Sequence, residues 1–440
     1  MAHGRLFAVA MLIGAGLSAP AMPQVTVPAP NSADTPLTLD QAESLALTNQ
    51  PRLLAAQLRA RATAERIREA RAGLLPTASF DATGAEVADT GTATAAGNLT
   101  TSSLSNRFAY GGNLSQLVTD FGRTHALIAS ERASSEAQTD RTTLTRAQVR
   151  LNVREAYYAV LGEESVLHAA QAALTNRQLV LRQLNVLEQN QLRSTLDVNF
   201  AAVLVSQAKL AVVQAQSEVS QAREKLATAM GESQPIAAAL VDVDPSTEPL
   251  PPNPEGPQRQ AQLQRADLSA ARAQQRAAEQ YATAEKRLSL PTLKVLAAAG
   301  DIPYHDHTLH SNYAAAGFNL DIPVFNGGLF SARRAQAELE ANARSEDTKE
   351  LSLEVSEQVR DAWYRANEAF QSLDVSNQLV TQAREALRLA QDRYDSGLGS
   401  IVELNEAQLN ETSAEINAAS AVDTYLTRRA ELDFSTGLLN

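Results

Sequence analysis

The chain has 440 residues, no cysteine, one tryptophan and a net charge of −12 from 38 basic and 50 acidic side chains. The missing cysteine excludes disulfides, cysteine-based zinc sites, thiol nucleophiles and a lipid-bearing N-terminal cysteine, and the acidic balance argues against nucleic-acid binding. So few large aromatic residues do not suggest one thick globular core, and the alanine-, glutamine- and arginine-rich remainder favours long helices that pack closely through small residues.

The N-terminus has the three regions of a secretory signal peptide. Arg5 supplies the positive charge, residues 6–17 form a short apolar stretch, and Ala19-Pro20-Ala21 gives a small-x-small cleavage pattern. We therefore predict a signal peptide over residues 1–21, followed by an extended segment over residues 22–36. No run of 18 apolar residues comes after it, so we expect no transmembrane helix in the mature chain.

A long stretch without glycine or proline lies in the second half of the chain. It covers residues 329–396 and would be about 100 Å long as one helix. Its apolar residues form one main seam with the spacing of four and three that is typical of a coiled coil. The seam consists of Val355, Val359, Ala362, Ala366, Ala369, Leu373, Val380, Ala383, Leu387, Ala390 and Tyr394. Trp363 and Phe370 lie off this seam, which predicts contacts on two sides of the helix.

The two halves of the chain are copies of each other. Residues 153–158 (VREAYY) resemble residues 359–364 (VRDAWY) at an offset of 206. Upstream, residues 75–77 (LPT) match residues 290–292 (LPT) at an offset of 215. Because several such blocks keep the same order, the sequence indicates a tandem duplication.

Each copy has the same predicted order of a first helix, a β-hairpin, a long helix and a last helix. A glycine turn precedes each long helix, at Gly122 in the first copy and at Gly327 and Gly328 in the second. The predicted boundaries are repeat 1 over 37–235, with helix 38–74, hairpin 76–121 and helices 123–190 and 194–231; a proline-rich connector over 236–257; and repeat 2 over 258–440, with helix 258–289, hairpin 291–325 and helices 328–396 and 400–437.

Both hairpins alternate between apolar and polar residues with a period of two. Phe108 and Tyr110 share one parity, Arg107 and Ala109 share the other, and Phe318 lies on the apolar parity of the second hairpin. A half-buried hairpin of a soluble domain would show the same alternation. In an exported chain, strands of about ten residues also fit tilted membrane-spanning strands, with the aromatic parity facing lipid.

The number of strands bears on the oligomeric state. Two hairpins give four strands, which cannot close a barrel, and an open sheet edge is not tolerated in lipid. Two chains would give eight strands with a filled interior, and three chains would give twelve strands with a lumen. If these strands span a membrane, the sequence predicts an obligate homo-oligomer.

Several short motifs, arranged twice in the same order, resemble those of the outer-membrane efflux protein (TolC) family over nearly the whole mature chain. The resemblance implies a mainly α fold with membrane β structure. It implies a coiled-coil α-helical barrel about 100 Å long and a trimeric twelve-stranded transmembrane β-barrel, with four strands per chain. The motifs are Leu37-Thr38-Leu39-Asp40-Gln41-Ala42, Leu75-Pro76, Asp120-Phe121-Gly122-Arg123, Asn326-Gly327-Gly328 and Tyr394-Asp395-Ser396-Gly397-Leu398.

The same resemblance implies a function without catalysis or cofactor. The chain would be a homotrimeric exit duct in the outer membrane of a Gram-negative bacterium, extending into the periplasm. A periplasmic adaptor and an inner-membrane pump, proton-driven (RND) or ATP-driven (ABC), would feed it. An alternative is a periplasmic coiled-coil adaptor or scaffold without a pore, although adaptors do not predict two amphipathic strand pairs. A hydrolase has little support, because the sequence has no HExxH motif or phosphate-binding loop.

The helix-to-helix turns at 191–198 and 397–404 correspond, by resemblance, to a periplasmic entrance that closes at rest. Glu403 and Glu406 stand at family positions for an acidic ring, and Asp197 is the first-copy equivalent of Glu403. Such a ring would attract cations. Helix capping explains Glu403 and Asp197 equally well, since Ser400-x-x-Glu403 reads as a capping box. Glu406 lies beyond the cap and is the stronger pore candidate.

Two further features concern the entrance and the outer loop. Tyr394 matches an aromatic residue of the family's closing network, and it also fits the coiled-coil seam. Gly399 stands where some members have an arginine that ties the closed entrance together, so we expect the locking bonds to differ here. His305, His307 and His310 have a spacing that could bind a metal, but an exposed polar loop is the preferred interpretation.

Overall fold

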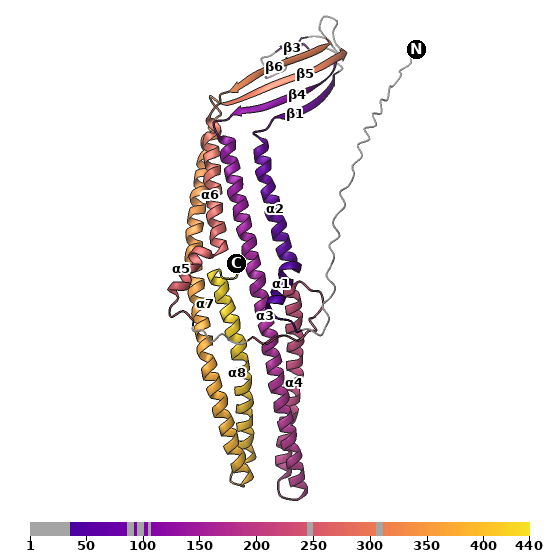
Figure 1. The fold of residues 1–440 in the computed structure, drawn as a ribbon, viewed down its shortest axis with the longest axis vertical. Helices are drawn as coiled ribbons and strands as arrows, with labels where there is room; N and C mark the ends of the chain where they lie inside the picture. Colours follow the sequence, from indigo (N-terminus) through magenta and orange to yellow (C-terminus); the bar gives the residue numbers. More distant parts are fainter. Residues whose placement is uncertain (1–35, 86–91, 95–100, 104–106, 244–249, 305–310) are drawn as a thin grey trace, which may run out of the picture.

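The computed structural model describes the chain except residues 1–35, 86–91, 95–100, 104–106, 244–249 and 305–310. It is an elongated molecule with a β-sheet at one end and two helical hairpins at the other (Figure 1). The predicted signal peptide and the triad His305, His307 and His310 lie outside the described residues. Within the described part, the main elements are α1 (Leu39–Asn49), α2 (Pro51–Ala72), β1 (Thr77–Ala85), β4 (Arg107–Thr119), α3 (Arg123–Gln189), α4 (Thr195–Met230), α5 (Glu255–Gln264), α6 (Ala266–Lys286), β5 (Thr292–Tyr304), β6 (Asn312–Asp321), α7 (Leu329–Asp395) and α8 (Ile401–Thr436).

The duplication is visible in the helix lengths. α3 and α7 each have 67 residues, and α4 and α8 each have 36, so both pairs match at the offset of 206. A 67-residue helix is about 100 Å long. Short elements complete the chain: the 3-10 helix η1 (Arg287–Ser289) after α6, and the strands β2 (Thr92–Thr94) and β3 (Thr101–Ser103), which pair with each other.

The first helix of each copy is interrupted, whereas the sequence predicts one continuous helix over 38–74 and another over 258–289. Gln50 separates α1 from α2 and Arg265 separates α5 from α6, both with an extended backbone. These two residues are related by the offset of 215. Pro51 explains the first break, because a residue that precedes proline avoids the helical conformation. Arg265 has no proline after it, and its guanidinium instead binds Asp267 and Gln358.

The glycine that ends α4 packs against the break between α1 and α2. The glycine that ends α8 packs against the break between α5 and α6. Gly231 and Gly437 both have a left-handed conformation, with φ of 79° and 83°. A Cβ atom on Gly231 would lie 2.9 Å from the Asn49 carbonyl oxygen, and one on Gly437 would lie 3.1 Å from the Gln264 carbonyl carbon. The equivalent ends of the two copies therefore pack in the same way, and both positions require glycine for conformation and for space.

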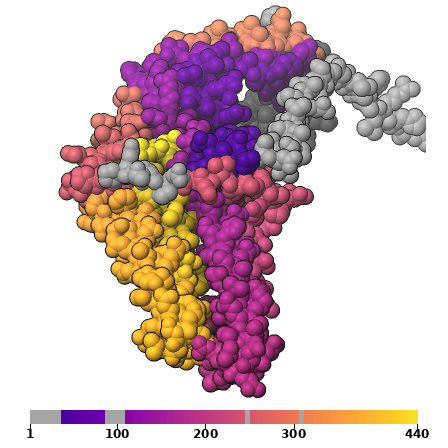
Figure 2. Space-filling view, turned by 60° about the horizontal axis from the view of Figure 1, so that its bottom comes forward, coloured from indigo at the N-terminus to yellow at the C-terminus, as the bar shows by residue number. Residues whose placement is uncertain are grey.

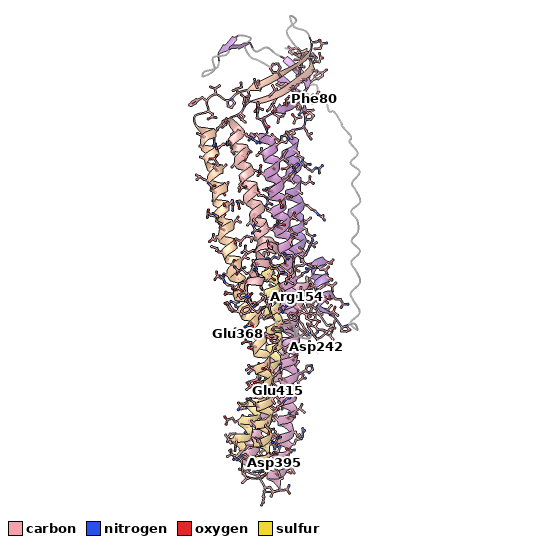
Figure 3. The ribbon with its side chains drawn as sticks, turned by 60° about the vertical axis from the view of Figure 1, so that its left-hand side comes forward. Phe80, Arg154, Asp242, Glu368, Asp395 and Glu415 are labelled. Carbon is pink, nitrogen blue, oxygen red and sulfur yellow. The ribbon has the colours of Figure 1, made fainter. Side chains whose placement is uncertain are left out.

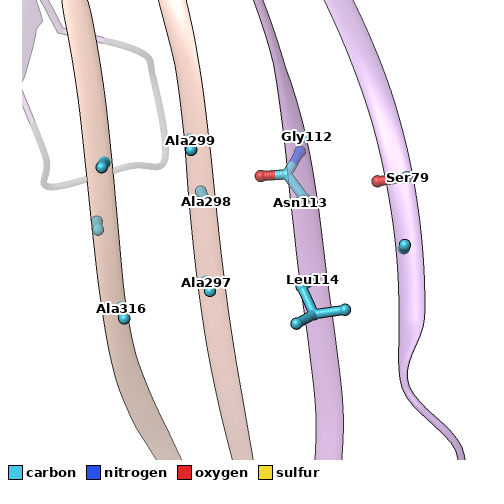
Figure 4. A pocket seen from close by; sticks show the side chains of 11 residues that line it. Ser79, Gly112, Asn113, Leu114, Ala297, Ala298, Ala299 and Ala316 are labelled. Carbon is cyan, nitrogen blue, oxygen red and sulfur yellow. The ribbon is translucent and has the colours of Figure 1, made fainter.

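The four long strands form one antiparallel sheet in the order β1-β4-β5-β6. The pairing of β4 with β5 joins the two hairpins, with Gly112 opposite Ala299 and Leu114 opposite Ala297. Strands β1 and β6 lie at the edges and have no further strand partner among the described residues. Figure 4 shows the four strands side by side at this level.

The two faces of the sheet differ in chemistry. Phe80, Phe108, Tyr110 and Phe318 share one face by register, and the rings of Phe80 and Phe108 lie 6.3 and 6.2 Å from that of Tyr110. The other face has the polar residues of the opposite parity. There, the Asn113 amide donates a 2.6 Å hydrogen bond to Asp81. The alternation predicted from the sequence is therefore present in the folded sheet.

Small residues dominate the middle of the sheet. Ala297, Ala298 and Ala299 of β5 lie beside alanines of β6, and no large side chain of either strand crosses this level (Figure 4). One tyrosine lies across glycines instead. A Cβ atom on Gly111 or Gly300 would collide with the Tyr313 hydroxyl, so these glycines keep that ring close to the backbone of the sheet.

The helices form a row beneath the sheet, in which α2 contacts α3, α3 contacts α6, and α6 contacts α7. Small polar side chains bridge neighbours at close range. The Ser130 hydroxyl donates to the Ala277 carbonyl at 2.8 Å, and the Thr142 hydroxyl lies 3.3 Å from the Ala56 carbonyl. Alanine dominates the buried positions of α6. The scarcity of aromatic residues thus fits a thin wall of closely packed helices.

The middle of the molecule has the largest apolar cluster. Tyr157 of α3 is fully buried there, and its hydroxyl lies 2.8 Å from the Leu37 carbonyl and 2.7 Å from the Val241 carbonyl. Leu37 and Leu240 form a parallel bridge beside it. Tyr157 therefore ties together the segments that precede α1 and follow α4.

A network of ion pairs joins the two copies at the same level. The Arg154 guanidinium of α3 lies 2.6 Å from Glu43 of α1 and 3.8 Å from Asp433 of α8. Figure 3 shows Arg154 in this middle region, between Phe80 at the sheet and Asp395 near the opposite tip. The network links α1 and α3 of the first copy to α8 of the second.

The seam predicted for the long helix of the second copy is buried or half-buried throughout its length. Trp363, which the sequence places off the seam, is also buried, and its indole N–H donates to the Pro251 carbonyl at 2.9 Å. The Phe370 ring lies 5.5 Å from that of Tyr425 on α8. The proline-rich connector therefore packs against one side of α7 while α8 packs against another.

Helix α4 alone, among the helices of the described chain, is long and apolar enough to cross a membrane by length and composition. The absence of a long uninterrupted apolar run predicts no such helix, since Lys209 and several glutamines interrupt the apolar residues of α4. α4 lies along α3, with a 2.6 Å ion pair between Arg223 and Glu164. Much of its apolar surface remains exposed, including Leu210 and Val213.

Candidate periplasmic entrance

The two helical hairpins end in tips of similar construction. In the first tip, Gln191 has a positive φ of 60° and the amide of Leu192 donates to the Leu187 carbonyl at 2.9 Å. In the second, Gly397 has a φ of 75° and the amide of Leu398 donates to the Arg393 carbonyl at 2.9 Å. This bond pattern closes the end of each long helix in a Schellman-like turn.

Each last helix begins with a serine cap. The Ser400 hydroxyl accepts a 3.1 Å hydrogen bond from the amide of Glu403, which is the first half of the predicted capping box. The second half is not formed, because the Glu403 carboxylate lies 3.3 Å from the Arg393 guanidinium instead. In the first tip, Ser194 accepts from the amide of Leu196 rather than from that of Asp197.

An apolar cluster holds the two tips together. It combines Leu184 of α3 and Ala201 of α4 with Ala390, Tyr394, Ile401 and Leu404 of the second copy. Leu184 and Leu404 are almost completely buried. Figure 2 shows the two hairpins as columns that run side by side to their ends. The tips are therefore in contact within one chain.

Arg193 provides a polar link across this contact. Its guanidinium carbon lies 4.1 Å from the centre of the Tyr394 ring, and its Nη2 donates to the Tyr394 carbonyl at 2.9 Å. An arginine over an aromatic face is attracted by the ring's negative charge distribution. The link joins the turn after α3 to the end of α7, and it is not among the features predicted from the sequence.

The offset of 206 would have pointed to this residue. Arg193 is the first-copy equivalent of Gly399, the position at which the sequence lacks the expected arginine. A Cβ atom on Gly399 would lie 3.1 Å from the Tyr394 nitrogen and 3.2 Å from Arg393, so a side chain there would crowd α7. The arginine that contacts Tyr394 is therefore supplied by the first copy rather than by the second.

Tyr394 is buried, and its hydroxyl has no hydrogen-bond partner in the described residues. Burial raises the pKa of Tyr394, Arg193 opposes this, and the nearby Asp197 and Asp395 add to the rise. Tyr394 therefore stays neutral at physiological pH. Its ring serves as a contact surface for Arg193 in a partly acidic environment.

The acidic candidates occupy different environments. Glu403 forms the ion pair with Arg393, whereas Glu406 is exposed and takes part in no ion pair or side-chain hydrogen bond within the described chain. Asp197 is half-buried close to Tyr394. Phe200, the first-copy equivalent of Glu406, is exposed. Among these three acids, only Glu403 has an ion-pair partner within the described residues, and Glu406 is the exposed one of the two unpaired carboxylates.

The predicted glycine turns lie at the opposite end of the long helices. Gly122, Gly327 and Gly328 have positive φ values of 86°, 63° and 85° and lie directly before α3 and α7. The Gly122 carbonyl accepts a 2.7 Å hydrogen bond from Arg287, and Asp120 accepts from the amides of Gly122 and Thr124. These turns connect the sheet to the helices and are about 100 Å from the tips.

Comparisons with known proteins agree with this architecture. The profile of the family described as outer membrane efflux protein matches residues 43–232 and 258–438. The chain is 28% identical to the outer membrane protein TolC of Escherichia coli K12, over 92% of this chain and 84% of that protein. It is 26% identical to TolC of Salmonella enteritidis, over the same shares.

Solved structures of outer-membrane channels have the same fold. The channel OprN superposes with a TM-score of 0.79 at 21% identity, covering 91% of this chain and 89% of that one. VceC of Vibrio cholerae gives 0.76 at 19% identity, with 91% and 96% covered. The open state of the MtrE channel of Neisseria gonorrhoeae gives 0.75 at 21% identity, with 91% and 88% covered. The family profile matches most of the chain, in two segments that coincide with its two copies, and the chain therefore belongs to the outer membrane efflux protein family.

Proposed function

We propose that this outer-membrane efflux protein is a passive exit duct, built as a homotrimer and closed at rest by its helical tips. The observation that carries the proposal is the sheet, which has one apolar aromatic face and two edge strands, β1 and β6, without partners in the described part of the chain. Pairing β6 of one copy with β1 of the next would satisfy both edges. Three copies would supply twelve strands around a lumen.

The helical region supports the same assembly. α4 has an exposed apolar stripe at helical spacing, formed by Leu196, Phe200, Val203, Leu210 and Val213. We call this set the α4 stripe. On α8, Val402 and Leu409 are exposed at the equivalents of Leu196 and Val203. Contact with further copies of the chain would bury these surfaces and continue the helical wall into a tube.

We infer that the tips form the gate of this duct. The Arg193–Tyr394 link and the shared apolar cluster hold the first and second hairpins together within a chain. Opening the periplasmic end would require these hairpins to separate, which would break the link. Glu406 would then line the entrance and favour cations, with Glu403 and Asp197 in supporting positions.

The proposed partners follow from the need for an energy source. The sequence contains no nucleotide-binding motif. Transport against a gradient would therefore need a separate protein that supplies the energy. We propose that a periplasmic adaptor docks on the helical tips and that an inner-membrane pump of the RND or ABC class supplies the substrate. The alternative function, a periplasmic adaptor or scaffold without a pore, has no observation in its favour.

The proposal is tested on the full mature protein from membranes. Membrane fractionation and unboiled gel electrophoresis should give a heat-labile species of three chains in the outer-membrane fraction. Reconstitution into planar bilayers should give channels of low resting conductance. A soluble monomer in the periplasmic fraction would refute the duct. Crosslinking in cells, followed by identification of the inner-membrane protein that co-purifies, would determine the class of pump.

A further inference from the structure

A groove lies between the end of α2 and the start of α3, directly beneath the sheet. Its volume is about 340 Å³, and Arg71, Leu74, Leu75, His125, Ile128 and Arg132 line it. Two guanidinium groups and an imidazole therefore share one groove with three aliphatic side chains. None of the lining residues is acidic.

The two arginines of this groove have no carboxylate partner within the described residues. Arg71 and Arg132 are exposed and take part in no ion pair or side-chain hydrogen bond within the described residues. Many other arginines pair with carboxylates, for example Arg276 with Glu136 at 2.8 Å and Arg388 with Glu385 at 2.7 Å. The C-terminal end of α2 carries a partial negative charge, which favours an arginine at Arg71 without a carboxylate partner. The same reason does not apply to Arg132, because it lies in the third turn of α3.

The groove lies on the same side of the helix row as the aromatic face of the sheet. Arg132 is nine residues from Arg123, or two and a half turns, and so lies on the opposite side of α3. Arg123 lines a second, polar cavity together with Lys294 and Asn319, whose strand positions belong to the polar face of the sheet. The first groove is therefore on the side of the aromatic face. In agreement, Gln116, on the aromatic face, donates to the Leu74 carbonyl at 2.8 Å.

The depth of the groove corresponds to a membrane boundary. Exposed apolar side chains surround the base of the sheet, which marks the periplasmic limit of the apolar band. Below this band, the headgroup zone of a leaflet is about 5 to 7 Å deep. His125 and Ile128 lie within the first two turns of α3, so the groove begins in this zone. The apolar collar consists of Leu75, Val118, Phe121, Leu290, Ile322, Val324, Phe325 and Leu329.

We propose that the α2–α3 groove binds an anionic glycerophospholipid of the periplasmic leaflet. Arg71 and Arg132 would hold the headgroup phosphate through charge-assisted hydrogen bonds, and His125 would add a donor. Leu74 and Leu75 would contact the upper part of the acyl chains. The groove lies within one subunit, since α2 and α3 are adjacent members of the helix row. This inference rests on the membrane position of the sheet and goes beyond the proposed duct.

The test uses the purified, full-length mature protein and three lipids. Native mass spectrometry after exchange into mild detergent would count bound phosphatidylglycerol, phosphatidylethanolamine and phosphatidylcholine. We expect retention of phosphatidylglycerol at an apparent affinity at least about tenfold above that for phosphatidylcholine. The double variant Arg71→Gln/Arg132→Gln should lose this preference. The control Arg66→Gln/Arg141→Gln removes two exposed arginines from the same helices outside the groove and should keep it.

The outcomes separate the inference from the proposed function. Equal retention by the wild type and by R71Q/R132Q would overturn the groove as the lipid site. Displacement of the lipid by millimolar inorganic phosphate would show a free-anion site and would also overturn it. Single-channel conductance should be the same in both double variants. Normal conductance without lipid preference would leave the duct intact and refute only the lipid site.

Discussion

At the scale of single residues, Arg193 is the side chain on which the proposed closed entrance depends most directly. It contacts Tyr394 through its charge and through a hydrogen bond to the backbone, so both contacts are lost on truncation. We expect Arg193→Ala to shift the closed-to-open ratio by on the order of tenfold, because such contacts each contribute about 1 kcal/mol or more. Planar bilayer recordings should show a higher resting conductance.

The matched control for this prediction is Arg182→Ala. Arg182 is exposed on α3, close to the tip, and has no partner within the described chain. It should leave the resting conductance unchanged. If Arg193→Ala and Arg182→Ala behave alike, the Arg193–Tyr394 link does not restrain the gate.

Glu406 and Glu403 allow the acidic ring to be tested residue by residue. Glu403 is paired with Arg393, whereas Glu406 is exposed and unpaired in the described residues. An unpaired carboxylate at a narrow entrance raises the local concentration of cations more than a neutralised one does. Glu406→Gln should therefore reduce the potassium-to-chloride permeability ratio more than Glu403→Gln does. Reversal potentials in a salt gradient measure this ratio, and the reverse order would remove Glu406 from the pore.

At the scale of elements, the contact between α3 and α8 contains a titratable group that the gate does not use. Asp423 of α8 packs against Gly162 of α3, where a Cβ atom would lie 2.9 Å from the carboxylate. Burial raises the pKa of Asp423 to about 7, and Glu163 adds to the rise. Burial and Glu218 in turn raise the pKa of Glu163, and Lys225 opposes this.

The raised pKa predicts how stability depends on pH. Between about pH 4 and pH 7 the folded chain keeps a proton on Asp423 that the unfolded chain releases, so this group lowers stability as pH rises. The slope is at most about 1.4 kcal/mol per pH unit for each chain. Asp423→Asn should remove it and raise the unfolding temperature at pH 8 but not at pH 4. Asp361→Asn, an exposed change on α7, should leave the profile unaltered.

The glycine that follows α8 gives a second prediction, on how that helix packs against the break between α5 and α6. Gly437→Ala would introduce strain at a φ of 83° and would crowd the α5–α6 break, because the new Cβ atom would lie 3.1 Å from the Gln264 carbonyl carbon. Gly328→Ala would introduce similar strain at 85°, but its nearest contact is 3.8 Å away. We expect a loss of about 1–2 kcal/mol for Gly328→Ala and a clearly larger loss for Gly437→Ala. Equal losses in denaturant unfolding would show that the contact between α8 and the break contributes nothing.

The elements also show what the sequence could and could not predict. Glycine and proline positions, together with the offset of 206, indicate the long helices because these signals are local and occur twice. The break at Gln50 has a local signal in Pro51, while the break at Arg265 has none and follows only from the offset of 215. Arg193 was missed because its role depends on contact with another copy of the repeat. The register between β4 and β5 is likewise a long-range pairing without a local signal.

At the scale of the whole molecule, we propose that the chain is one segment of a larger wall. Its sheet has two unpaired edges, and the α4 stripe exposes five large apolar residues, of which Val213 is 61% and Leu210 is 58% exposed. A monomer with such a surface would associate or aggregate. The low content of aromatic residues is consistent with this design, because a tube wall one helix thick has no thick core to fill.

The α4 stripe therefore predicts how the assembly can be broken. Leu210→Glu with Val213→Glu would place two carboxylates in the proposed interface between copies, where burial of unpaired charge is strongly unfavourable. We expect the fraction of heat-labile trimer on unboiled gels to fall at least about tenfold, while circular dichroism of the detergent-solubilised chain retains its helical signal. The control Leu263→Glu changes a residue that is 84% exposed on α5 and should leave the trimer intact. A stable trimer in the double variant would mean that the stripe faces solvent or a different protein, and the helical wall would then have to close through other surfaces.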